Sequence, residues 1–186
     1  MFRSAVGALL VMGTLIHAPA WAQKVRLTTS MGDVVLQLDA EKAPKTVANF
    51  LAYVKSGHYA GTVFHRVIDG FMIQGGGMTP DLNEKATRAP IPLEARNGLN
   101  NQRGTVAMAR TMVPDSATAQ FFVNLTDNAF LDAANSRDGN GYAVFGRVVD
   151  GMDVVDKIKA APTANKGPHA NVPIEPILIK KATLEK

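Results

Sequence analysis

The sequence contains no cysteine among its 186 residues. This absence excludes thiol nucleophiles, disulfide exchange and cysteine-based metal sites. If the chain is exported to an oxidising compartment, its stability must rest on the packed core alone, because no disulfide can form.

A large excess of charge of either sign is also lacking. The chain has 20 lysine and arginine residues against 16 aspartate and glutamate residues, and the basic residues form no run or patch interleaved with aromatics. Nucleic acid is therefore not expected as a partner.

Motifs of several common enzyme classes are missing as well. There is no G-x-S-x-G elbow and no P-loop, since Gly75–Gly77 is not followed by the Lys and Ser or Thr of a phosphate-binding loop. The histidines after residue 22 do not have the spacing of metal ligands. His65 is more typical of a structural histidine, although a general-base role stays open. No metal site and no cofactor are predicted.

The apolar stretch near the N-terminus, residues 5–16, is too short to span a bilayer, for which about 20 residues are needed. Arg3 precedes it, and the small residues Ala20 and Ala22 follow in the pattern that signal peptidase recognises. Residues 1–22 are therefore interpreted as a signal peptide cleaved after Ala22. The alternatives are an uncleaved anchor and a buried N-terminal helix.

The mature chain, residues 23–186, is long enough for one compact domain and shows short strand patterns with only two helix patterns. A helix is expected over 44–55, and a shorter one around 152–158, while 76–101 carries the turn signals of loops. Strands are expected at 25–29, 34–38 (after a tight Gly32-Asp33 turn), 63–68, 71–75, 105–109, 120–124, 143–149 and 177–184. This pattern favours a β-barrel or sandwich over a βαβ fold.

One arginine lies among apolar residues in the block 64–77. The Arg66 guanidinium cannot lose its charge, so its burial is costly unless it is paired or lines a cleft. Alternatively, the aliphatic part of the side chain packs against apolar neighbours while the guanidinium reaches water. The residues alone favour this second interpretation.

The same block resembles the F-H-R-x-I-x-x-F-M-I-Q-G-G signature of the cyclophilins. Further stretches follow in the family's order: Gly104–Arg110 is similar to its G-x-x-x-M-A strand, Asp115–Phe122 to its S-Q-F-F region, and Phe130–Asp132 with Tyr142–Val149 completes the pattern. On these motifs the sequence is identified as a member of the cyclophilin-type peptidyl-prolyl cis/trans isomerases, and it is similar to their periplasmic branch in Gram-negative bacteria.

The resemblance implies a mainly β fold, a closed eight-stranded antiparallel β-barrel capped by two α-helices. It implies an isomerase acting on X-Pro bonds of folding exported proteins in the periplasm. The expected partners are proline-containing segments of such proteins, and not nucleic acid or, after signal cleavage, the membrane. A monomer is expected. The alternative is a holding chaperone or Pro-peptide binding module that uses the same groove.

The resemblance also assigns roles to individual residues. Arg66 is expected to donate a hydrogen bond to the prolyl nitrogen of the twisted amide, Gln74 to hold the substrate carbonyl, and Phe71 to contact the proline ring from the entry of its strand. The residues expected to bind substrate are Met72, Ala109, Arg110, Gln120, Phe122, Phe130, Leu131 and Tyr142.

Three positions depart from the commonest eukaryotic pattern of the family. Phe130 stands where tryptophan is usual, Tyr142 where histidine is usual, and Arg110 where asparagine is usual. Without the indole N–H, a donor used in the cyclosporin complex is lost. We expect weak cyclosporin binding with isomerase activity retained.

Overall fold

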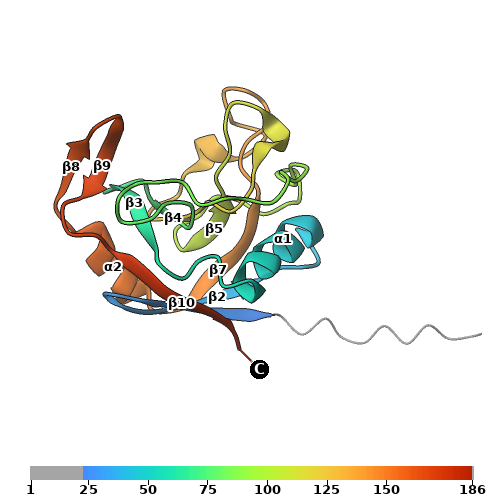
Figure 1. Cartoon of the computed structure of the whole chain (residues 1–186). Helices are drawn as coiled ribbons and strands as arrows, with labels where there is room; N and C mark the ends of the chain where they lie inside the picture. The colour runs from blue at the N-terminus through green and yellow to red at the C-terminus, as the bar shows by residue number, and fades with distance from the viewer. Residues whose placement is uncertain (1–22, 186) are drawn as a thin grey trace, which may run out of the picture.

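The computed structural model describes residues 23–185, and the predicted signal peptide over residues 1–22 lies outside them. Eight antiparallel strands close into a barrel in the order β1-β10-β3-β4-β6-β5-β7-β2 (Figure 1). Their bounds are β1 Lys24–Thr29, β2 Gly32–Leu38, β3 Thr62–Ile68, β4 Met72–Gly75, β5 Thr105–Met108, β6 Phe121–Asn124, β7 Val144–Asp150 and β10 Leu178–Leu184. The expected closed eight-stranded antiparallel barrel is confirmed.

Two helices lie at opposite ends of the barrel, α1 at Pro44–Lys55 and α2 at Met152–Lys159 (Figure 1). Pro44 occupies the first turn of α1, where its missing N–H costs no hydrogen bond. Gly57, with φ of 71°, follows the end of α1. The apolar stripe of α1 is buried against the barrel core through Val47, Phe50, Leu51 and Val54. No helix within residues 23–185 is long and apolar enough to cross a membrane.

The strands of one side of the barrel are buried on both faces. Ile73, Val106 and Val123 belong to the main core together with the residues of α1. Their neighbours in sequence, Met72 and Phe122, belong to a separate cluster. Because successive side chains of a strand point to opposite faces, this second cluster lies on the outside of the barrel.

The fold differs from the sequence expectation in two places. The turn between β1 and β2 is made by Ser30 and Met31, so that Gly32 and Asp33 already belong to β2. The hairpin of β8, Thr163–Lys166, and β9, His169–Pro173, was not expected. It forms a separate two-stranded sheet whose strand β9 lies against β3 (Figure 1).

Candidate functional site

An apolar cluster on the outer face of the barrel contains most of the residues predicted to bind proline. We call it the outer cluster. Its buried members are Met72, Ala107, Phe122, Leu131 and Val144, and its partly buried members are Ile68, Phe71, Leu99, Ala109 and Tyr142. The cluster therefore collects side chains from several strands and from the loops that follow β6.

The strand register places Arg66 beside the outer cluster. Arg66 of β3 lies opposite Gln74 of β4, and Gln74 lies opposite Phe122 of β6. Phe122 in turn lies opposite Ala107 of β5. Directly opposed residues of antiparallel strands have their side chains on the same face. A cation, an amide and an aromatic ring thus form one row across adjacent strands.

Arg66 is partly buried, and its guanidinium remains available for an external acceptor. Ion pairs within residues 23–185 engage Arg26, Arg103 and Arg110 but not Arg66. No hydrogen bond to the Arg66 side chain occurs within the same residues either. A half-buried cation without an internal partner is suited to a substrate group that approaches from outside.

Gln74 is oriented by a second glutamine. Its Nε2 donates a hydrogen bond of 2.8 Å to Oε1 of Gln120. Gly77 makes this possible, because a Cβ atom at residue 77 would lie 2.3 Å from Cγ of Gln120. The three consecutive glycines therefore provide room for packing, and the second N–H of the Gln74 amide is left for a ligand.

Aromatic rings form the exposed side of the outer cluster. Phe71 lies in the turn before β4, at the strand entry where it was expected, and its ring stacks on Phe130 at 5.6 Å between centroids. Phe130 is 57% exposed. Tyr142 packs edge-to-face on Phe122 with centroids 5.7 Å apart. Each of these four predicted residues is thus in contact with another of them.

The predicted contacts of Ala109 and Arg110 involve the backbone. The Ala109 N–H donates to the carbonyl of Gln120 at 3.0 Å. Within residues 23–185 no hydrogen bond uses the Ala109 carbonyl or the backbone of Arg110. The Arg110 side chain, in contrast, is only 2% exposed and points toward the chain's own loops.

His65, the other residue considered for catalysis, is too deeply buried to reach a substrate as a base. It is 6% exposed, and its Nδ1 has no hydrogen-bond partner within residues 23–185. Burial lowers its pKa from 6.5 to about 4. No group of three His, Asp or Glu side chains within the described part of the chain could hold a metal ion.

Neither Arg66 nor Gln74 lines either of two surface hollows, although the larger hollow borders the outer cluster at Leu99 and Val144. The larger, of about 490 Å³, is lined by parts of β2, β7 and the loop before β5. The smaller, of about 250 Å³, lies between β3 and the β8–β9 hairpin. The aromatic rings of the outer cluster, Phe71, Phe122, Phe130 and Tyr142, line neither hollow.

Comparison with known families decides the assignment. Residues 24–184 match the family described as cyclophilin type peptidyl-prolyl cis-trans isomerase/CLD. This chain belongs to the cyclophilin-type peptidyl-prolyl cis-trans isomerases. The protein is therefore an enzyme that interconverts the cis and trans forms of X-Pro peptide bonds.

Relatives of this cyclophilin carry the same activity in their names. A peptidyl-prolyl cis-trans isomerase of Streptomyces antibioticus is 59% identical over 161 residues, which cover 86% of this chain and 97% of the relative. Isomerase B of Escherichia coli is 55% identical over 87% of this chain and 99% of its own length. Isomerase A of Dickeya dadantii is 52% identical over 99% of this chain and 98% of its own length.

Solved structures agree with the fold of this cyclophilin. A cyclophilin-type isomerase of Cryptosporidium parvum has a TM-score of 0.77 and 29% identity, and covers 89% of this chain and 99% of its own. The same protein in the presence of the dipeptide Ala-Pro gives a TM-score of 0.76 and 30% identity, and covers 88% of this chain and 99% of its own.

A buried polar network that the sequence did not reveal supports the outer cluster of this cyclophilin. Nδ2 of Asn128 donates to the carbonyl of Phe71 at 3.0 Å and to Oδ1 of Asn124 at 2.8 Å. Asn124 bonds to Asn101, whose N–H donates to the carboxylate of Asp132 at 2.7 Å. Because these groups are buried and mutually bonded, they fix the loop that carries Phe130 and Leu131 relative to Phe71.

Proposed function

We propose that Arg66 accelerates the isomerisation by donating a hydrogen bond to the prolyl nitrogen as the amide twists. Rotation about a peptide bond meets a barrier of about 18–20 kcal/mol because conjugation is lost. In the twisted state the nitrogen regains a lone pair that can accept a hydrogen bond. A donor aimed at it stabilises the transition state more than the planar ground state.

The observation that carries this proposal is the row of Arg66, Gln74 and Phe122, with a guanidinium that has no partner within residues 23–185. Arginine is permanently charged and can donate several hydrogen bonds, but it cannot act as a base. The mechanism therefore needs no proton transfer, covalent intermediate or nucleotide.

We further propose that the outer cluster receives the proline ring. Met72, Phe122 and Leu131 supply its buried apolar wall, and Phe71 supplies the exposed edge with Phe130 and Tyr142 at the rim. Gln74 is proposed to hold the substrate carbonyl through its second N–H, and Gln120 to add a side-chain contact. The backbone of Ala109 and Arg110 is proposed to bond an extended segment.

The proposed substrates are proline-containing segments of exported proteins, met by the monomeric enzyme in the periplasm after cleavage behind Ala22. The support for cleavage is the basic residue, apolar stretch and small-residue site of residues 1–22. The family model matches residues 24–184, so the matched domain begins after that segment.

A protein that only holds proline-containing segments is the competing function, since it could use the same apolar surface. A protease-coupled prolyl-peptide assay with peptide in large molar excess separates the two. We expect acceleration in proportion to protein concentration, because each molecule turns over many peptides. If acceleration ends once the peptide exceeds the protein, the protein binds proline-containing segments without catalytic turnover.

Cyclosporin should inhibit this enzyme weakly. The ring of Phe130 stacks on Phe71 and carries no N–H group, so it cannot donate the hydrogen bond that an indole at this position would supply. Titration of cyclosporin into the prolyl-peptide assay measures the effect. Inhibition at nanomolar concentration would contradict this expectation.

A further inference from the structure

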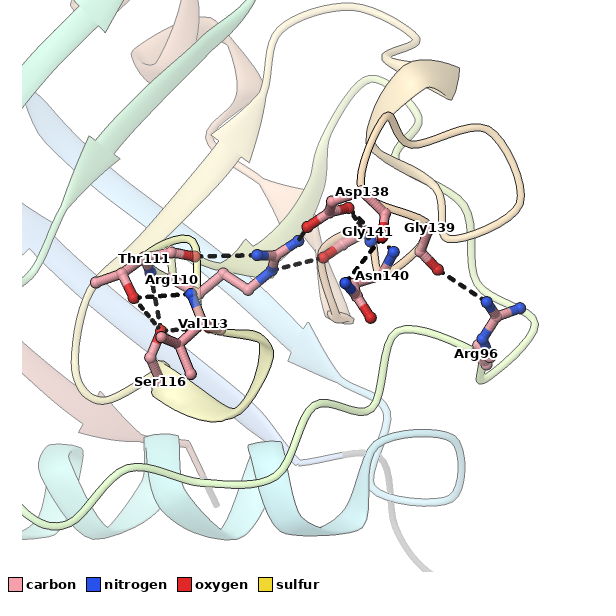
Figure 2. Close-up of polar contacts among 9 residues, drawn as sticks. All are labelled: Arg96, Arg110, Thr111, Val113, Ser116, Asp138, Gly139, Asn140 and Gly141. Atoms are coloured by element: carbon pink, nitrogen blue, oxygen red, sulfur yellow. Dashed lines mark hydrogen bonds and ion pairs between the residues drawn. The ribbon is translucent and has the colours of Figure 1, made fainter.

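The Arg110 side chain is almost completely engaged by its own chain. Its Nε donates to the Gly141 carbonyl at 2.8 Å, and one terminal nitrogen donates to the Thr111 carbonyl at 3.0 Å. The other terminal nitrogen forms an ion pair with the carboxylate of Asp138, as Figure 2 shows. Arg110 therefore fastens the loop after β5 to the loop that precedes β7.

The carboxylate of Asp138 is itself fixed in place. It accepts a hydrogen bond of 3.0 Å from the N–H of Asn140 and a longer one of 3.4 Å from the N–H of Gly141 (Figure 2). The Asn140 N–H and then Arg110 hold the pKa of Asp138 well below its usual range. The charge that Arg110 needs is thus present throughout the physiological pH range.

Gly141 is required where it stands. Its φ is 71°, and a Cβ atom there would lie 2.5 Å from the backbone nitrogen of Ala133. Only glycine can therefore present this carbonyl to Arg110 without strain. The next residue, Tyr142, is tied back to the carbonyl of Leu131 at 2.9 Å.

The guanidinium of Arg110 also lies against a ring of the outer cluster. Its central carbon is 4.6 Å from the centroid of the Tyr142 ring. The same ring packs edge-to-face on Phe122. Arg110, Tyr142 and Phe122 thus form a continuous series that runs from the fastened loops into the cluster.

We propose that Arg110 is a positioning residue that holds the Tyr142 ring against Phe122 and so sets the shape of the proline-binding surface. The proposal rests on the assignment of the outer cluster as the place where proline binds. The two parts of Arg110 then have different tasks. Its side chain orders the wall of the site, and its backbone, unbonded within residues 23–185, meets the substrate.

The test compares Arg110→Ala with Arg26→Ala, which removes another ion-paired arginine, on β1. We expect Arg110→Ala to raise KM for a prolyl peptide about five- to twentyfold. The substitution removes the cation–π contact with Tyr142 and leaves that ring less ordered. The value of kcat should change less than about twofold, since Arg66 is untouched. Arg26→Ala should leave both unchanged. A fall in kcat at constant KM, or no change in either, would overturn the proposal.

A double-mutant cycle with Tyr142 gives a readout that a general loss of stability would not move. Tyr142→Ala should raise KM at least as much as Arg110→Ala does, and the double variant should be no worse than Tyr142→Ala alone. Tyr142→Phe, which keeps the ring against Phe122, should raise KM less than Tyr142→Ala does. Additive effects of the two alanine substitutions would mean that Arg110 does not act through Tyr142.

A second variant and a binding measurement also test the proposed role of Arg110. If Arg110→Ala does not fold, Asp138→Asn keeps the arginine and removes only its ion-pair partner, and a smaller rise in KM is expected. Dissociation constants for a non-cleaved prolyl peptide, obtained by calorimetry, follow the same order without any turnover. The binding measurement tests the role of Arg110 even if the activity assay contradicts the proposed role of Arg66. Dissociation constants that do not change in the Arg110 and Asp138 variants would refute the role of Arg110.

Discussion

Replacing Arg66 with alanine should lower kcat/KM for a prolyl peptide by about 10²–10³, the usual cost of removing one preorganised donor from a developing charge. The loss should fall mainly on kcat, because the donor interacts with the twisted amide and only weakly with the planar one. Peptide affinity should change much less, since the apolar wall of Met72 and Phe122 stays intact. The protease-coupled assay gives the rate, and calorimetry gives the affinity.

Arg66→Lys separates charge from geometry. Lysine keeps the positive charge but lacks the planar fork of donors, so we expect a loss intermediate between that of alanine and none. Arg147→Ala is the matched control, because Arg147 is an exposed arginine on β7. It should keep full activity. An Arg66→Ala variant that retains most of its kcat would refute the proposed mechanism.

The helices and barrel strands were predictable because their signals are local. The stripe of α1 recurs at helical spacing, and its bounds of Pro44–Lys55 agree with the residues expected from Pro44 and Gly57. The β8–β9 hairpin carried no such signal. All four residues of β8 are exposed, so no alternation of apolar and polar side chains marks the strand.

The site was less predictable because its geometry depends on pairing between distant strands. Alternation along β4 separates Met72 from Ile73, but it cannot say which faces the interior when both faces are buried. The row of Arg66, Gln74 and Phe122 exists only once the register of β3, β4 and β6 is fixed. The family resemblance supplied what local pattern could not.

The supporting roles of Asn128 and of the Arg110 side chain could not be predicted from the sequence. Asn128 looks like an ordinary loop asparagine until its bonds to Phe71 and Asn124 are seen. Arg110 was expected to meet substrate, and its position in the chain allows this for the backbone. The side chain turns away because Asp138, 28 residues further along, offers a fixed carboxylate.

Acid should destabilise this enzyme through His65. Burial lowers the pKa of His65 to about 4, and His169 and Arg66 nearby add to the effect. The native state therefore binds fewer protons than the unfolded state, where the pKa is about 6.5. The stabilisation is complete above pH 6.5 and is lost as pH falls toward 4. The difference between the pKa values of His65 in the unfolded and folded states corresponds to about 3 kcal/mol of unfolding free energy. About 2 kcal/mol of this is lost between pH 7 and pH 5.

Urea unfolding of the unmutated protein and of His65→Phe, at pH 7 and at pH 5, measures this linkage. Phenylalanine also places a planar ring there and does not titrate, so its variant should lose about 2 kcal/mol less over the same pH interval. Burial also lowers the pKa of His58, which makes His58→Phe the matched control with a smaller expected change. If His65→Phe keeps the full pH dependence of the unmutated protein, His65 is not the responsible group.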